Sequence, residues 1–371
     1  MPNSQLQDLS AMVLSSELNP PALILSQLVE ILHPAYSTKM NIVLLALPAF
    51  PHGSTSATSP PLHAISHQLV IDACRIITNF AAQGPDDYLA SDPGGTLPVS
   101  ASNPLLAPGK YFYHLAPHHI TKYPLVKEFG AFKFPEVIPR HWIRPKTIEE
   151  EAQLRATYED IRPSRMSNRV RGDDKACLVT KYRSGTSCSL GFHVSLSTLV
   201  AVCETSRLVP REETAWFVAN GMGRYSRSTL GSTVDDVGNG LTLRCDMRRL
   251  LDNHAFVFYP VGNRKYVTYV LRESAQDYVE LLHGREVTAP LRVSDEFLYA
   301  RFAYNIIKPR SWVFPLSVVG IPVDPVVARL QQDLRSSKED SPQTACESSL
   351  LTMQGFDNAS MFGEYALVQV H

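Results

Sequence analysis

Three histidines have the spacing in this sequence that is closest to a metal-binding pattern. His114, His118 and His119 form H-x3-H-H, and neutral imidazole nitrogens are common zinc ligands. No cysteine or acidic residue follows at the spacing of known zinc motifs, and none of the six cysteines forms a C-x-x-C pair. The chain also lacks the motifs of phosphate-binding loops, zinc proteases and serine hydrolases. We therefore expect neither a metal site nor a bound cofactor.

A second pattern lies between residues 203 and 252. It contains Leu-Val-Pro at 208–210, Trp-Phe at 216–217, Asp-Asp at 235–236, Asn-Gly-Leu at 239–241 and Asp-x-x-Arg-Leu at 246–250. In its order and spacing this segment resembles the fungal branch of the HNH-nuclease family. The resemblance extends over about 140 residues, 172–309, with an opening strand at 177–180 and a closing helix at 297–307. It implies an α+β fold with a ββα-type core.

The resemblance also implies where the chemistry of the family would be, and the chain departs from the family there. HNH cleavage uses one histidine as a general base, an asparagine that orients it, and a second histidine on the helix as a metal ligand. Asn239 is kept, but Arg207 stands at the position of the base and Arg248 at that of the ligand. Arginine is protonated at any accessible pH, so it neither accepts a proton nor offers a lone pair to a metal. We therefore expect a degenerate HNH motif without metal-dependent nuclease activity.

Three roles remain open for Arg207 and Arg248. They pair with Asp235, Asp236 or Asp246 as structural replacements for the metal, they bind an anion, or they donate hydrogen bonds to a substrate. The Asn239-Gly240 step has an alternative of its own, because this dipeptide is typical of a left-handed turn before a strand. Trp216 is likewise typical of a buried ring in a hydrophobic core.

We interpret the degenerate motif as the site of a metal-free cyclase or pericyclase of the Diels–Alder type. A pocket that holds a flexible polyene in its reactive conformer lowers the entropic barrier, and a cationic or amide donor polarises a carbonyl. The candidate catalytic residues are Arg207, Asn239 and Arg248, and the candidate substrate-binding residues are Trp216, Tyr225, Asp235 and Asp246. The expected substrate is a small apolar polyene or terpenoid. In this respect the chain is similar to fungal pericyclases of secondary metabolism, such as the norbornene-forming Diels–Alderases of sordarin-type diterpenoid biosynthesis.

Two other functions fit the loss of both histidines. The chain is a non-catalytic pseudo-nuclease that binds nucleic acid or a protein partner, or it is a residual HNH endonuclease. The formal net charge is −1, from 35 Lys plus Arg against 36 Asp plus Glu, and affinity for nucleic acid depends on basic residues that neutralise phosphates. We therefore do not expect nucleic acid as the partner. The basic run at 162–183 is interpreted as a solvated face, with a remnant DNA-binding surface as the alternative.

Periodicity predicts the elements that position these residues. Helices are predicted at 20–33, 62–82, 148–161, 247–251 and 325–334, and strands at 177–180, 199–203, 241–243, 256–260 and 266–271. The Pro- and Gly-rich stretch 83–110 is predicted to be a long loop.

The length of 371 residues favours more than one domain. We expect a mainly helical N-terminal region with a Pro- and Gly-rich linker at 1–110, an HNH-like α+β domain at 111–325 and a partly disordered tail at 326–371. The sequence has no signal-peptide pattern at its start and no apolar stretch of about 20 residues, so we expect an intracellular, soluble, cytoplasmic protein without a membrane span.

Overall fold

The structure is a computed structural model that describes only part of the chain. The described residues are 27–35, 43–52, 62–79, 87–115, 123, 125–183, 202–230 and 233–309. All of them belong to one compact unit, residues 1–319. The helix predicted at 325–334, the tail and the second compact unit, 320–371, lie outside the described residues.

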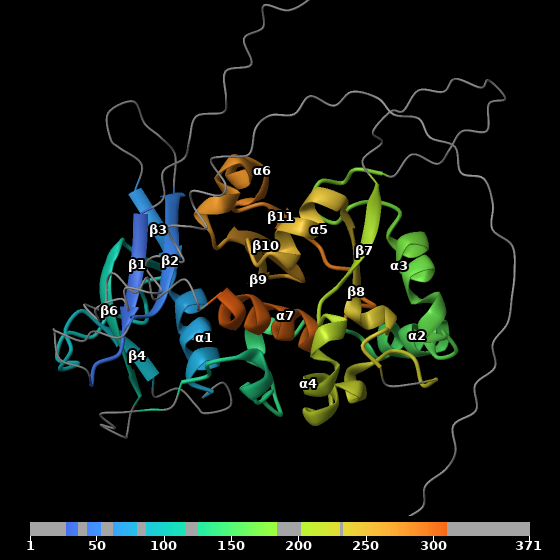
Figure 1. Cartoon of the computed structure of the whole chain (residues 1–371), viewed down its shortest axis with the longest axis horizontal. Coiled ribbons are helices and arrows are strands. Elements are labelled where there is room, and N and C mark those ends of the chain that lie inside the picture. The colour runs from blue at the N-terminus through green and yellow to red at the C-terminus, as the bar shows by residue number, and fades with distance from the viewer. Residues whose placement is uncertain are drawn as a thin grey trace, which may run out of the picture. The chain divides into compact units, whose positions relative to one another are not determined.

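A six-stranded sheet forms the N-terminal part of the described unit. Its strands are β1 Gln27–Leu32, β2 Val43–His52, β3 Leu62–Ser66, β4 Asp87–Ala90, β5 Leu105–Leu106 and β6 Gly109–Leu115. The strand order is β4-β6-β1-β2-β3-β5, and every neighbouring pair is antiparallel except β6 and β1, which are parallel. Helix α1, His67–Thr78, follows β3 (Figure 1) and buries ten of its twelve residues.

This sheet corrects the prediction of a mainly helical N-terminal region. The described part of the predicted helix at 20–33 is strand β1, in which Val29 and Ile31 are buried two residues apart. The apolar residues there satisfy a period of two as well as a helical period, and pairing with β2 and β6 decides between them. The first five residues of the predicted helix at 62–82 form β3, and the predicted loop at 83–110 contains β4 and β5.

The rest of the described unit mixes short strands and helices. The strands are β7 Cys203–Arg207, β8 Gly240–Arg244, β9 Phe256–Gly262, β10 Lys265–Val270 and β11 Glu286–Val287. The helices are α2 Ile148–Tyr158, α3 Met166–Asp174, α4 Thr214–Ala219, α5 Cys245–Asp252, α6 Val279–Leu282 and α7 Asp295–Ile307. Strands β7 and β8 pair antiparallel, α5 follows β8 directly, and β9, β10 and β11 form a three-stranded antiparallel sheet.

The predicted helices that become α2, α5 and α7, and the strands that become β8, β9 and β10, are confirmed. The predicted strand at 177–180 is wrong, because the chain turns there: the Lys181 N–H donates to the carbonyl of Cys177 at 3.0 Å. One bond to β8 remains, from the Leu178 N–H to the Thr242 carbonyl at 2.9 Å. Of the strand predicted at 199–203, only Val202 and Cys203 are described, and β7 begins at Cys203.

Helix α7 runs through the core that both parts share. Twelve of its thirteen residues are buried, which is typical of a helix surrounded by protein. It packs against α1 on one side and β9 on another, as Figure 1 also shows. One hydrophobic cluster extends from Val29 on β1 to Ile307 at the end of α7. No helix among the described residues is long and apolar enough to cross a membrane.

Candidate functional site

Asn239 lies just before β8 and is 0% exposed. Its side-chain amide donates to the carbonyls of Val209 at 2.9 Å and Val234 at 2.7 Å, and its side-chain oxygen accepts from the Val209 N–H at 2.8 Å. A primary amide has only two N–H donors, and both are used here. Asn239 therefore ties the segment after β7 to the loop before β8 and has no N–H left for a substrate.

Arg207 ends strand β7 and is paired with Asp235. Its Nε donates to the Asp235 carboxylate at 2.6 Å, and Arg211 donates to the same carboxylate at 3.1 and 2.7 Å. Burial acts to raise the pKa of Asp235, but the hydrogen bonds from Arg211 and Arg207 outweigh it and hold that pKa below its ordinary value. One carboxylate thus pairs with two guanidinium groups.

Arg248 projects from α5 and is held by two carboxylates. Its guanidinium contacts Glu204 on β7, and its Nε lies 3.4 Å from Asp252 one turn further along α5. Asp252 also lies 3.3 Å from buried Arg301 of α7, which donates to the Leu251 carbonyl at 2.6 Å. Asp252 therefore bridges Arg248 and Arg301.

A cavity of about 280 Å³ lies among these arginines. Arg207, Arg248 and Arg301 line it together with Arg211, Glu212, Asp252 and Tyr304. Both acidic side chains are engaged: Glu212 accepts from the Tyr304 hydroxyl, and Asp252 pairs with two arginines. The resemblance implies a divalent metal here, but four permanent cations and two engaged carboxylates do not fit one.

The structure brings Arg207 and Arg248 to one cavity and leaves the other predicted site residues outside its lining. Trp216 is 3% exposed, donates to the Phe132 carbonyl at 2.6 Å and stacks in an aromatic cluster, so it is a core residue. The half-buried ring of Tyr225 lies 5.7 Å from that of Phe134. Asp246 pairs with Arg244 at 2.7 and 2.6 Å.

Of the aspartates considered as partners for the two arginines, only Asp235 pairs with one of them. Asp236 is buried and accepts from the backbone N–H groups of Arg227, Ser228 and Gly238. Burial raises the pKa of Asp236 despite these bonds. Glu204 and Asp252, which hold Arg248, were not predicted from the sequence, although Arg248 and Asp252 have the i, i+4 spacing of a helical ion pair.

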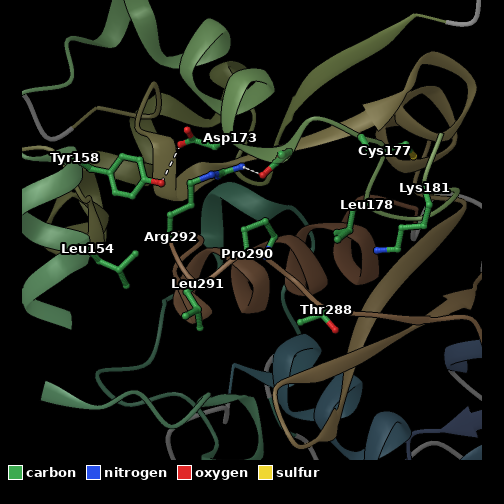
Figure 2. Close-up of a pocket in the computed structure, with 12 residues that line it drawn as sticks. Leu154, Tyr158, Asp173, Cys177, Leu178, Lys181, Thr288, Pro290, Leu291 and Arg292 are labelled. Carbon is green, nitrogen blue, oxygen red and sulfur yellow. Dashed lines mark hydrogen bonds and ion pairs between the residues drawn. The ribbon is translucent and has the colours of Figure 1, made fainter. Parts of the chain in front are cut away.

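A second cavity, of about 410 Å³, is formed by α2, the end of α3, the segment 176–181 and the segment 288–292 (Figure 2). Its lining is mixed: Leu154, Leu178, Pro290 and Leu291 contribute hydrocarbon, and the remaining lining residues are mostly polar or charged. Sequence reasoning did not find it, because its walls come from four segments that no motif connects.

The polar side chains that line this second cavity differ in whether they bind another lining residue. The Tyr158 hydroxyl donates to Asp173 at 2.9 Å, and Arg292 donates to Asp174 at 2.6 Å, as the dashed lines in Figure 2 mark. The exposed side chains of Lys181 and Thr288 also line the cavity, and no dashed line joins either to another residue drawn. These two side chains are therefore the donors in the lining that a ligand could engage.

The histidine pattern is only partly described. His118 and His119 lie outside the described residues, whereas His114 is on β6 and stacks on Tyr88 with ring centroids 5.1 Å apart. Within the described ranges, no group of three or more His, Cys, Asp or Glu side chains is placed to hold a metal ion.

Comparison with known proteins agrees with the motif. Residues 177–259 match the family model described as HNH endonuclease, a range that includes β7, Asn239, β8 and α5. Neither the curated proteins nor the solved structures gave a match. This segment of the α+β fold is therefore an HNH endonuclease-like domain.

Proposed function

We propose that the chain is a metal-independent cyclase of the Diels–Alder type that acts on a small apolar polyene or terpenoid. We place the reaction in fungal secondary metabolism, as in the norbornene-forming Diels–Alderases of sordarin-type pathways that the sequence resembles. The observation that supports this proposal best is the 410 Å³ cavity of Figure 2. Its volume is in the range of about 300–1,000 Å³ for small-molecule sites, and its lining combines leucine and proline side chains with polar donors.

We place the reaction in the larger cavity and not at the catalytic residues predicted from the sequence. Asn239 has no free N–H, and Arg207 and Arg248 are held by carboxylates, so we assign these three side chains structural roles. The ion pairs occupy the positions where the family has its base and its metal ligand. The Arg248–Glu204 pair joins α5 to β7, and the Arg207–Asp235 pair joins β7 to the loop before β8, so these contacts form without a metal. For this reason the chemistry proposed here uses no metal.

The cavity supplies what a cycloaddition requires. Leu154, Leu178 and Leu291 would contact the polyene and hold diene and dienophile together, which replaces a costly search through conformers. Lys181 and Thr288 would donate hydrogen bonds to a carbonyl on the dienophile and stabilise the charge that develops on its oxygen. Two carbon–carbon bonds form as π bonds are consumed, and no atom or electron leaves, so the product has the mass of the substrate.

Comparative mass spectrometry tests the proposal. The producing host with and without this chain is compared, and we expect a less cyclised isomer to accumulate in its absence. Purified protein treated with EDTA should convert that isomer without a change of mass. Identical metabolite profiles in the two hosts would contradict the proposal.

A variant that fills the larger cavity tests whether the reaction takes place there. Leu178→Trp adds an indole to the wall of the cavity, and we expect kcat/KM to fall at least tenfold because the substrate is excluded. The matched control is Val218→Trp, since Val218 is exposed on α4 and lines neither cavity. Equal activity of the two variants would place the reaction elsewhere.

The second candidate is a nuclease or pseudo-nuclease, which the match at 177–259 favours. The arginines of the smaller cavity argue against it, because each already pairs with a carboxylate that a phosphate would have to displace. Incubation of plasmid with the protein and Mg²⁺, Mn²⁺, Ni²⁺ or Zn²⁺ should leave the plasmid intact. Cleavage that copurifies with the protein and stops on addition of EDTA would favour this second candidate.

A further inference from the structure

The surface around α3 is strongly basic in a chain that is otherwise nearly neutral. Residues 162–183 contain seven Lys or Arg and two Asp, whereas the whole chain has a net charge of −1. We use the name α3 basic surface for its exposed members, which are Arg162, Arg165, Arg171, Lys175, Lys181 and Arg183. Arg169, partly buried, completes the seven and pairs with Asp173 at 3.1 Å.

The acidic residues of this region pair with other side chains or are outnumbered by basic ones. Asp173 accepts from Tyr158 and Arg169, and Asp174 pairs with buried Arg292 at 2.6 Å. Glu159 and Asp160 precede the surface and are exposed, so seven basic residues stand against four acidic ones over 159–183. The charge that α3 presents to solvent is therefore positive.

The packing of α3 explains why these side chains point outward. Met166 and Val170 are buried against β8, where a Cβ on Gly240 would lie 2.6 Å from the Met166 methyl carbon and 2.9 Å from Val170. This close contact fixes one face of the helix inward. Arg165 and Arg171 are exposed, and among the described residues neither has an ion-pair partner within 4.0 Å.

An exposed apolar side chain adjoins the basic surface. Leu230 is 50% exposed, and the chain just before it is fixed to the start of the surface. The Thr229 N–H donates to the Glu159 carbonyl at 3.1 Å, and the Ser228 hydroxyl donates to the Ile161 carbonyl at 2.8 Å. At the other end of the surface, Lys181 lines the cavity of Figure 2.

Basic residues beside an exposed leucine match the surface of an anionic bilayer, and the adjoining cavity has leucine side chains in its lining. Lipid headgroups attract the arginines, and the acyl region accepts the leucine. A nucleic-acid backbone satisfies only the charges. We propose that the α3 basic surface docks the protein on an anionic membrane, so that an apolar substrate passes from the bilayer into the cavity of Figure 2. The purpose of this docking rests on the proposed function, but the docking itself is measured without any substrate.

Vesicle sedimentation with the full-length chain tests the docking. Vesicles of phosphatidylcholine alone are compared with vesicles that contain phosphatidylcholine and phosphatidylserine in a 7:3 ratio, whose anionic lipid gives the surface a negative potential. We expect binding only to the anionic vesicles, and weaker binding at about 1 M salt, where the Debye length falls to about 3 Å.

Charge reversal locates the docking surface. Arg165→Glu with Arg171→Glu should lower partitioning to the anionic vesicles at least about tenfold. Lys133→Glu with Arg140→Glu changes the net charge by the same amount at exposed positions outside α3, and this control should bind like the parent protein. Leu230→Ser should weaken binding without changing its salt dependence.

Several results would overturn the proposal. They are equal partitioning to neutral and anionic vesicles, an equal effect of the two charge reversals, and no sedimentation with either vesicle. Binding of a 30-base-pair DNA duplex, seen by fluorescence anisotropy without any vesicle binding, would also overturn it and would assign the surface to nucleic acid. If the protein binds anionic vesicles but has no cyclase activity, the proposed function fails and the inference of membrane docking stands.

Discussion

Asp72 on α1 joins three elements that are distant in the sequence. Its Oδ2 accepts from the imidazole of His141 at 2.6 Å, the indole of Trp142 at 3.1 Å and the hydroxyl of Tyr259 at 2.9 Å. Its Oδ1 accepts from Gln68 at 3.0 Å, and the residue is 0% exposed. A buried carboxylate is tolerated only where such donors replace water. Asp72 thus joins α1 to the segment at 140–142 and to β9.

Asp72→Ala is expected to lower the free energy of unfolding by about 3 kcal/mol or more, because several buried donors lose their acceptor at once. Urea denaturation followed by tryptophan fluorescence measures the change. Asp160→Ala removes an exposed carboxylate and should shift the free energy by less than about 0.5 kcal/mol. Equal effects of the two substitutions would show that the buried network contributes little.

Residue types alone predicted part of the site. The spacing of the motif placed Arg207 and Arg248 together, and both do line one cavity. Glu204, Arg301 and the second cavity escaped prediction because they depend on which faces of β7, α7 and α2 meet, and a linear motif does not contain that information. Asn239 kept its place in the motif, but its hydrogen bonds to backbone groups could be known only from the fold.

Elements were predicted well where local signals determine them. Thr147 caps the start of helix α2: its side chain accepts from the Glu150 N–H, and the Glu150 side chain accepts from the Thr147 N–H. Strand β1 was mistaken for a helix because it takes its conformation from β2 and β6, of which β6 begins at residue 109. Pairing over that distance leaves no trace in the local spacing of leucines.

His254, in the connection between α5 and β9, predicts a pH dependence of the free energy of unfolding. Burial lowers the pKa of His254 from 6.5 to about 4; the hydrogen bond with Asn305 opposes this effect, and the charge of Arg301 adds to it. Between these values the unfolded chain binds a proton that the folded protein does not. The stability that depends on neutral His254 is therefore complete above about pH 6.5 and is lost as the pH falls towards 4.

His254→Asn tests this dependence with a residue suited to the backbone, since His254 has a φ of 58° and Asn tolerates that conformation. Between pH 7 and pH 4.5, the free energy of unfolding should fall by about 1–2 kcal/mol less in the variant than in the parent. This difference is reduced because the imidazole ring is partly exposed. Urea midpoints at the two pH values measure it. Parallel behaviour of the two proteins would contradict it.

At the scale of the molecule, the N-terminal sheet and the rest of the described unit share one core. Helix α7 packs on α1, and the Tyr269 hydroxyl on β10 donates to the Pro48 carbonyl of β2 at 2.6 Å. Buried residues of both parts belong to a single cluster. The boundary predicted near residue 110 remains a prediction about sequence organisation, and the shared core indicates that the two parts depend on each other for stability.

A fragment of residues 111–371 is expected not to fold cooperatively, because it lacks α1 and exposes the face of α7 that α1 covers. Near-ultraviolet circular dichroism should be weak, and binding of the dye ANS should be strong. A fragment of residues 1–319 keeps the whole compact unit and serves as the control, with one sharp unfolding transition expected. A sharp transition in the shorter fragment would establish independent domains.

The position of α7 in the chain affects how the protein is made. This central helix ends at Ile307, so the apolar surfaces of α1 and β9 have no cover until the ribosome has synthesised most of the polypeptide. Translation at about 5–20 residues per second leaves these surfaces open on the nascent chain for many seconds. Maturation would therefore be largely post-translational, and chaperones that shield apolar segments would be needed before the last described helix closes the core.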